Sequence, residues 1–211
     1  MKNKVLVVVA HSDDETISMG GTIRKHVDIG DKVYVVSMTN GVGARSKVKD
    51  TEVLNRQLAA KQASKVLGFD WYKCYDFRDN EMDSYTLLEV VKAVELVKYE
   101  YNPSLVYTHS RADINIDHRV VNSAVMIAFR PQPGEICKEL RLFEVASSTD
   151  YGHPNITGRF TPNLFVNITC KWTSKSDALN AYNSEMREYP HSRSIEAIKN
   201  LAKIRGNQLV T

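Results

Sequence analysis

The sequence has few of the features that mark secreted, membrane-spanning or nucleic-acid-binding proteins. Its three cysteines, Cys74, Cys137 and Cys170, are far apart and form no CxxC pair, so neither a disulfide framework nor a cysteine zinc site is indicated. No apolar run approaches the ~20 residues of a membrane span, and the run 5–10 is also too short for a signal-peptide core. Lysine and arginine number 28 against 25 aspartates and glutamates, a balance too mild to favour a nucleic acid or an anionic membrane. These absences predict a reduced, cytoplasmic protein with no nucleic-acid partner.

The pattern that is present alternates strands with helices. A chain of 211 residues is expected to form one domain. Short β-branched runs predict strands, and amphipathic stretches ended by glycine or proline predict helices. The strands are expected at 5–10, 32–38, 71–75 and 105–108, and the helices from 13 or 14 to about 28, then at 51–67, 84–101 and 117–129. This alternation is typical of βαβ units and a parallel sheet.

The pattern changes after Arg130, where prolines and glycines interrupt it. Two further strands are expected at 140–145 and 164–168, as antiparallel additions to the sheet, and two further helices at 176–186 and 194–204. The predicted fold class is therefore α/β, a Rossmann-like doubly wound and mostly parallel sheet with a C-terminal antiparallel extension. Residues 1–211 are expected to be a single domain, with 131–211 as sheet extension and lid.

A dense polar cluster follows the first predicted strand, at the end of a sheet where doubly wound proteins bind ligands. It reads His11-Ser12-Asp13-Asp14-Glu15, an imidazole and three carboxylates within five residues. A nucleotide-binding loop would have glycines here, because phosphate requires close backbone approach. Carboxylates this close repel one another, and a bound cation would offset that repulsion.

A second polar cluster, 109–118, follows the strand expected at 105–108. His118 falls at the start of a helix and faces back toward the strand ends. Two loops at the same end of the sheet could therefore bring His11, Asp14 and His118 to one point. Two imidazoles, one carboxylate and an open position form the catalytic arrangement that zinc prefers.

Structural roles for single members of these clusters remain open. Asp13 and Asp14 could serve as N-caps of the first helix, and Asp117 could cap the helix that begins at His118. His109 could be a strand-end histidine with a satisfied hydrogen bond. The coincidence of two dense clusters, each after a predicted strand, favours the metal site.

The first cluster resembles the AHPDDE signature of the PIG-L / LmbE-like deacetylases, and residues 113–119 (DINIDHR) resemble the second signature of bacterial members. The resemblance extends to Arg56, to Asp79 in FRDNEM, and to Glu185-Met186-Arg187 with the PHSRS segment at 190–194. It spans most of the chain and is similar to the type found with surface-polysaccharide genes.

The resemblance implies a function and a set of roles. It implies an LmbE-like fold and a zinc-dependent hydrolase that removes the acetyl group of an N-acetylated amino sugar or sugar conjugate. His11, Asp14 and His118 would hold one Zn²⁺ per chain, although iron, cobalt or manganese could occupy the same ligands. Asp13 would be the general base, and Asp117 would support the polar network of the second loop. Residues matching positions around the substrate are Arg56 and Asp79, with His109, Asp117 and Arg193 as further candidates.

The sequence departs from the family pattern at three positions. Ser12 replaces the proline of the first signature, and Ala59 replaces a glutamate often found three residues after the arginine. Asn115 stands where many relatives have a histidine, three residues before the last ligand. An amide can donate a hydrogen bond to the oxyanion but cannot be a general acid, so the leaving amine would take its proton from Asp13 or from His191.

Two rival functions follow from the same residues. The chain could be a sugar- or nucleotide-binding module without turnover, which would not require Asp13. It could also be a metal-dependent esterase or phosphoesterase, although a two-metal site needs more bridging carboxylates than the sequence places together. Homo-oligomerisation is left open by the sequence.

Overall fold

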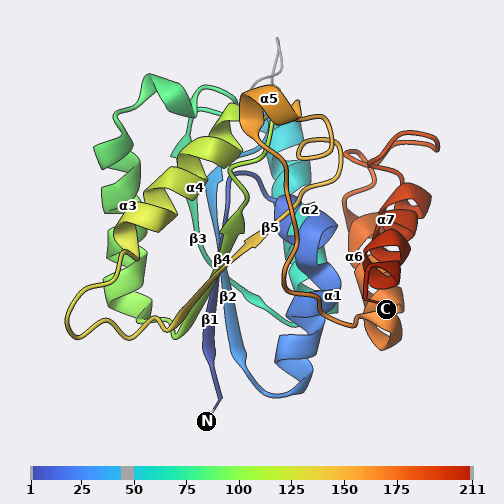
Figure 1. Ribbon diagram of the computed structural model, residues 1–211. Coiled ribbons are helices and arrows are strands. Elements are labelled where there is room, and N and C mark those ends of the chain that lie inside the picture. The colour runs from blue at the N-terminus through green and yellow to red at the C-terminus, as the bar shows by residue number, and fades with distance from the viewer. Residues whose placement is uncertain (1, 44–49, 210–211) are drawn as a thin grey trace.

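The computed structural model describes residues 2–43 and 50–209 and is built around a five-stranded parallel sheet (Figure 1). The strands are β1 (Lys4–Val9), β2 (Lys32–Thr39), β3 (Asp70–Phe77), β4 (Leu105–His109) and β5 (Glu139–Phe143). Their order is β3-β2-β1-β4-β5, and all four pairings are parallel. The strand order therefore reverses between β1 and β4, which is where doubly wound sheets open a crevice for ligands.

The central strand β1 has its position because it is apolar on both faces. Residues Val5 to Val9 are all buried, with relative exposures of 0–1%. Alternate side chains belong to two different cores, Val5, Val7 and Val9 to one and Leu6 and Val8 to the other. A strand covered on both faces has no polar side to show to water, which explains the continuous β-branched run.

Helices cover both faces of the sheet (Figure 1). Residues of α3 and α4 pack in one core, and residues of α1, α2, α6 and α7 pack in the other. The helices are α1 (Asp14–Asp28), α2 (Asp50–Leu67), α3 (Leu87–Tyr101), α4 (Ile116–Ala128), α5 (Pro154–Thr157), α6 (Trp172–Ala181) and α7 (Ile195–Asn207), with 3₁₀ turns η1 (Met82–Ser84) and η2 (Thr169–Lys171).

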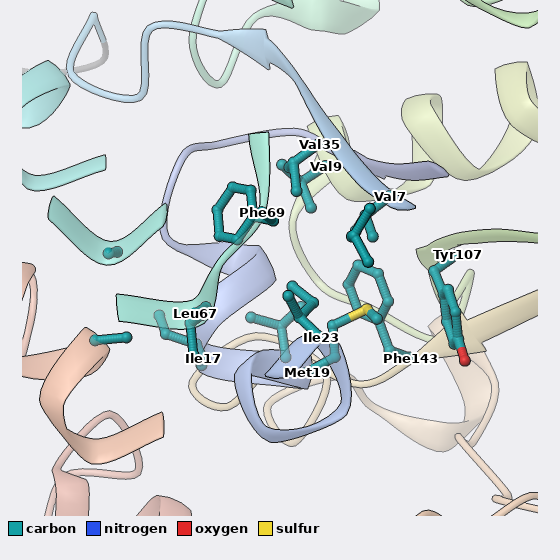
Figure 2. Packing of buried hydrophobic residues seen from close by; sticks show 14 of the residues in the cluster. Val7, Val9, Ile17, Met19, Ile23, Val35, Leu67, Phe69, Tyr107 and Phe143 are labelled. Atoms are coloured by element: carbon teal, nitrogen blue, oxygen red, sulfur yellow. The ribbon is translucent and has the colours of Figure 1, made fainter. Parts of the chain in front are cut away.

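The core under α1 fixes the first helix to the sheet (Figure 2). Ile17, Met19 and Ile23 of α1 lie in one cluster with Val7 and Val9 of β1, and all five side chains are at most 4% exposed. Burying an aliphatic side chain of this size stabilises a fold by roughly 1.5–3 kcal/mol. The start of α1, which carries the acidic cluster, is thereby held directly beyond the end of β1.

The doubly wound parallel sheet is confirmed, but the predicted antiparallel extension is wrong. β5 pairs with β4 in parallel, from Leu105 opposite Glu139 to His109 opposite Phe143. Residues 164–168 form no strand; Ile168 packs on Gly21 of α1, and the carbonyl of Asn167 accepts a hydrogen bond from Lys25. This segment therefore packs on a helix and does not join the sheet.

Helix boundaries differ from expectation where side chains cap them. α3 begins at Leu87 rather than at 84, because Thr86 and Glu89 form a capping box. α4 is capped by Asn115, whose side chain accepts a hydrogen bond from the backbone of Asp117, so the predicted cap role of Asp117 is wrong. α6 ends at Ala181, before the predicted 186, and its next residues turn toward the acidic cluster.

Candidate metal centre

The two polar clusters predicted from the sequence meet at the switch point of the sheet. His11 and Asp14 follow β1, and His118 lies in the first turn of α4, beyond the end of β4. Their side chains come from neighbouring strands and are buried, with residue exposures of 8%, 1% and 1%. The switch point thus brings together three possible ligands, of which His11 and His118 are 107 residues apart along the chain.

The three side chains form a nearly equilateral triangle of possible ligand atoms. His11 Nδ1 lies 3.2 Å from Asp14 Oδ2, His118 Nε2 lies 3.3 Å from the same oxygen, and the two ring nitrogens are 3.3 Å apart. A tetrahedral zinc ion with bonds of about 2.0–2.1 Å holds its ligand atoms about 3.3 Å apart. The chain therefore has a His/Asp cluster able to hold a divalent metal, with two imidazoles and one carboxylate.

A second group of possible ligands shares His11 but fits a metal less well. It consists of His11 with Asp79 and Asp117, whose oxygens lie 3.1 and 3.2 Å from Nε2 of the same ring. Both oxygens of Asp117 already accept backbone hydrogen bonds, from Asn80 at 2.7 Å and Met82 at 3.1 Å. One imidazole with two carboxylates is also the less favourable donor set for zinc. These carboxylates instead orient the His11 ring so that Nδ1 faces Asp14.

His118 has an equivalent support on its other ring nitrogen. Its Nδ1 lies 2.9 Å from Asp113 Oδ2, which also accepts a hydrogen bond from Thr149 Oγ1 at 2.8 Å. Ser148 Oγ donates to the other oxygen of Asp113. A carboxylate on the second nitrogen of a ligating histidine fixes its tautomer and ring orientation. Asp113 therefore leaves Nε2 of His118 directed toward Asp14 and His11.

The charges of this cluster favour a cation. Burial lowers the pKa of His11, but hydrogen bonds to Asp117 and Asp14 outweigh burial and hold the pKa well above its ordinary value. Burial also opposes protonation of His118, yet Asp14 and Asp113 raise its pKa to about 9. Either protons or a divalent cation must therefore balance the buried carboxylates. A metal binds neutral imidazole, so its binding would displace these protons.

Asp13 lies between the metal ligands in sequence but faces different partners. Its carboxylate oxygen Oδ2 pairs with Arg56 at 3.0 Å and lies 3.6 Å from Arg193. Its backbone has φ 149° and donates a hydrogen bond to Glu15 Oε2 at 2.9 Å. Burial raises the pKa of Asp13, and the Arg56 guanidinium opposes that shift. The structure therefore gives Asp13 a buried carboxylate that is separate from the ligand triangle.

Arg56 and Asp79 were expected to contact a sugar, and both are buried. Arg56 is 5% exposed and binds Ser12 Oγ at 3.2 Å and Glu185 at 2.9 Å, besides Asp13. Asp79 contacts the His11 ring and also lines a polar cleft of about 260 Å³ beyond β2 and β3. Arg56 therefore pairs with the Asp13 carboxylate, whereas Asp79 lies between the His/Asp cluster and this cleft.

His109 and Asp117 were also expected near the substrate, and the structure places both inside the protein at 0% exposure. His109 Nε2 accepts a hydrogen bond from the Ala10 N–H at 2.8 Å, and its ring stacks on His118 with centroids 3.9 Å apart. Burial, together with His118, holds the pKa of His109 well below its ordinary value. His109 is thus a neutral histidine at a strand end, bonded through Nε2 to Ala10 and stacked on His118.

The remaining predicted site residues surround the cluster at greater distance. Asn115 caps α4 through Oδ1, and its Nδ2 donates to Asn80 at 3.1 Å, so its amide is already engaged in the loop. Arg193 donates to Ser147 Oγ at 2.8 Å and is the only one of these three beside Asp13. His191 is exposed, accepts a hydrogen bond from the backbone of Arg193 and lies edge-on to Tyr151.

Several residues of the site were not predicted individually. Asp113 and Glu185 appeared in the recognised motifs without a role, and the Glu15 and Tyr182 contacts were missed. Tyr182 donates to Glu15 at 2.9 Å across 167 residues, and burial raises the pKa of Glu15 to about 7. The only signal in the sequence was a third carboxylate directly after the two aspartates of the first cluster.

A family model described as PIG-L, GlcNAc-PI de-N-acetylase, matches residues 6–129, more than half of the chain and including all three ligands. The chain belongs to this PIG-L family. The matched range contains both loops that carry the His/Asp cluster. In the part of the chain that the structure describes, no helix has the length and apolar character to cross a membrane.

Similar proteins cover almost the whole chain. A relative from Bacillus cereus, named probable N-acetyl-alpha-D-glucosaminyl L-malate deacetylase 2, is 28% identical over 92% of this chain and 90% of its own length. The N,N'-diacetylchitobiose deacetylase structure from Pyrococcus horikoshii covers 99% of this chain and 80% of its own, with TM-score 0.74 and 23% identity. The structure of the 4-carboxy-2-hydroxymuconate hydratase from Pseudomonas putida KT2440 covers 99% of this chain and 87% of its own, with TM-score 0.69 and 23% identity. The fold is therefore shared by deacetylases and by at least one enzyme of different chemistry.

Proposed function

We propose that this protein is a zinc-dependent deacetylase that hydrolyses the acetamide of an N-acetylated amino sugar or sugar conjugate. The observation that carries the proposal is the ligand triangle of His11, Asp14 and His118 beside a separate buried carboxylate, Asp13. Zinc fits because two imidazoles and one carboxylate are its usual ligands in hydrolases. When bound, zinc supplies a Lewis acid that makes water nucleophilic near neutral pH.

Asp13 is placed to move the protons of this reaction. Its two described ion pairs both involve Oδ2, which leaves Oδ1 to accept a proton from the attacking water. Hydroxide adds to the acetyl carbon, the C–N bond breaks, and the nitrogen takes a proton to leave as the amine while acetate forms. Asp13 can return the proton that it took, so no second acid is required. His191 is therefore not needed as the acid, which agrees with its position: its described contacts are with its own loop and Tyr151.

The substrate is proposed to lie over the cleft beside Asp79. This cleft is lined by polar side chains, among them Asn40, Asp76 and Glu81, which can accept or donate hydrogen bonds to sugar hydroxyls. The curated relative with the malate-conjugate name covers nearly the whole chain, which supports a sugar conjugate as the substrate. Arg193, partly exposed beside Asp13, could contact an acidic group of such a conjugate.

We propose that residues 131–211 complete this single domain as sheet extension and lid.

The direct test is acetate release by the zinc-loaded protein. The panel should contain N-acetylglucosamine, diacetylchitobiose and N-acetylglucosaminyl malate, with phosphate release from a sugar phosphate measured in parallel. The proposal predicts acetate from at least one amide and no phosphate. Phosphate release without acetate would favour the phosphoesterase alternative, and binding without any product would favour a non-catalytic module. Water addition to an unsaturated acid, without acetate, would favour hydratase chemistry.

Two variants separate the roles of Asp13 and His118. Asp13→Asn should remove nearly all turnover, leaving only a small residual rate, and keep one zinc per chain, because Asp13 is not part of the ligand triangle. His118→Ala should lose the metal. Metal analysis by mass spectrometry and acetate release measure the two properties independently. Asp31→Asn is a matched control, since Asp31 is a buried aspartate that pairs with His26 at the opposite end of the sheet. Loss of zinc from a folded Asp13→Asn variant would contradict the assignment of Asp13 as base.

A further inference from the structure

Asp13 has an unusual backbone that needs support from elsewhere in the fold. Its φ of 149° lies in a region that residues with a side chain rarely adopt. Such a conformation costs of order 1–3 kcal/mol and persists only where surrounding contacts determine it. Its carboxylate is 2% exposed, so it cannot be oriented by bulk water. Among the contacts that support it are Glu15, which accepts the Asp13 N–H, and Arg56, which pairs with the carboxylate.

Both supports of Asp13 contact the same distant side chain, Tyr182. The Tyr182 hydroxyl donates to Glu15 Oε1 at 2.9 Å, and Glu15 Oε2 accepts the Asp13 N–H at 2.9 Å. The guanidinium of Arg56 lies 5.6 Å from the centre of the Tyr182 ring. Tyr182 itself is fully buried, directly after α6. One side chain from the C-terminal third therefore contacts both neighbours of Asp13.

The turn after α6 adds a second contact to Arg56. The backbone N–H of Glu185 donates to the carbonyl of Tyr182 at 2.8 Å, which closes the turn 182–185. Glu185 Oε1 then pairs with Arg56 Nη1 at 2.9 Å, opposite the Nη2 that binds Asp13. This arrangement fixes the guanidinium between two carboxylates. The turn thus acts on Asp13 through Glu15 and through Arg56 at once.

We propose that Tyr182 is a positioning residue for Asp13, supported by Glu185 of the same turn. The inference rests on the proposed function, in which Asp13 moves the protons of amide hydrolysis. Tyr182 does not touch the ligand triangle in any described contact, so its loss should spare metal binding. A small displacement of a reacting group can lower a rate about 10²-fold. The effect of Tyr182 should therefore appear in kcat rather than in KM or zinc content.

The test compares Tyr182→Phe with Tyr101→Phe in the zinc-loaded protein. Both changes remove one buried hydroxyl; that of Tyr101 donates to the carbonyl of Lys32 at 2.8 Å, far from the site. Tyr182→Phe should lower kcat about tenfold, with KM within about twofold and zinc at one per chain. Tyr101→Phe should keep the wild-type kcat. Equal kcat values for Tyr182→Phe and the wild type would overturn the inference.

A second comparison distinguishes positioning from a general loss of structure. In an Asp13→Asn background, Tyr182→Phe should not lower the residual rate further, because the group that it positions is already gone. If Tyr182→Phe lowered the rate by the same factor in both backgrounds, the inference would be overturned. If Tyr182→Phe does not fold, Glu185→Gln replaces it in the test. We expect Glu185→Gln to lower kcat, and an unchanged kcat would contradict the inference.

Failure of the proposed function is distinguishable from failure of this inference. If the wild type releases no acetate from any substrate, the proposed function fails. The contact is then tested alone, by urea unfolding of Tyr182→Phe, Glu15→Met and the double variant. The inference requires that the shifts in unfolding midpoint are not additive, since both variants break the same hydrogen bond. Additive shifts in the unfolding midpoint would mean that Tyr182 and Glu15 are not coupled, and this would contradict the inference.

Discussion

The imidazole of His11 has different partners on its two nitrogens, and this division determines where a metal can bind. Nδ1 faces Asp14 and His118, and Nε2 faces Asp79 and Asp117. The carboxylates on Nε2 set the ring orientation, so Nδ1 is available as a ligand. His118 is arranged in the opposite sense, with Nδ1 on Asp113 and Nε2 toward the metal position. Each of the two imidazoles is thus oriented by a carboxylate outside the triangle.

The first prediction at this scale concerns Asp113. Replacing a carboxylate that orients a ligating histidine typically lowers metal affinity 10–100-fold. Asp113→Asn should therefore weaken zinc binding by about that factor while the fold persists. Competition with a chromogenic chelator measures the affinity. Asp177→Asn, an exposed aspartate of α6, is the control and should bind zinc as the wild type does. Unchanged affinity in Asp113→Asn would contradict the role of Asp113.

The second prediction concerns the buried ammonium of Lys175. It is 3% exposed and donates to the carbonyl of Ser18 at 3.2 Å, beside the non-helical Met19 of α1. Burial lowers the pKa of Lys175 to about 8. Between pH 8 and about 10.4, the folded chain holds fewer protons at this site than the unfolded chain does, so unfolding takes up protons. The free energy of unfolding should therefore rise with pH through this window.

Lys175→Met isolates this effect, because methionine fills similar space without a charge. Subtracting its free energy of unfolding from that of the wild type removes the contribution of other titrating groups. The difference should shift in favour of the wild type by up to about 3 kcal/mol between pH 8 and 10.4, and should be constant below pH 8. Urea unfolding at each pH measures it. A difference that does not change with pH would show that Lys175 titrates normally.

At the scale of elements, the sequence predicts strands well where burial is symmetrical. β1 and β4 are almost entirely buried and rich in apolar residues, so their residues alone identify them. The direction of β5 and the absence of a strand at 164–168 could not be predicted, because both depend on what lies alongside. β5 has β4 as neighbour, while 164–168 has α1. A short apolar run does not say whether its neighbour is a strand or a helix.

The packing of this segment on α1 depends on Gly21. A Cβ at Gly21 would lie 2.8 Å from Ile168 Cβ, too close for an atom next to the backbone to move aside cheaply. Gly21→Ala should therefore lower the unfolding temperature, despite the better helix propensity of alanine. Gly206→Ala in α7 is the matched control, since its Cβ would meet nothing within 4 Å. That variant should be neutral or stabilised by up to about 1 kcal/mol. Thermal unfolding of both variants measures this, and a stabilised Gly21→Ala would contradict the close approach.

At the scale of the whole molecule, the candidate metal centre combines side chains next to the strand ends with side chains from segments distant in the sequence. The metal ligands were predictable because each is local to the end of one strand, and the parallel sheet brings such ends together. The residues that support Asp113 and Asp13 were not, because Thr149 reaches Asp113 and Tyr182 reaches Glu15 from segments with no fixed spacing to the motifs. The family signature predicted positions for Arg56 and Asp79 but not that both side chains would be turned toward Asp13 and His11.

The common metal position is the claim on which the proposed chemistry depends most directly. Anomalous diffraction at the zinc edge, from crystals of the zinc-loaded protein, tests it. We expect one peak per chain, at about 2.0–2.2 Å from His11 Nδ1, an Asp14 oxygen and His118 Nε2. A peak between His11 Nε2, Asp79 and Asp117, or one that leaves the His118 ring beyond bonding distance, would contradict it.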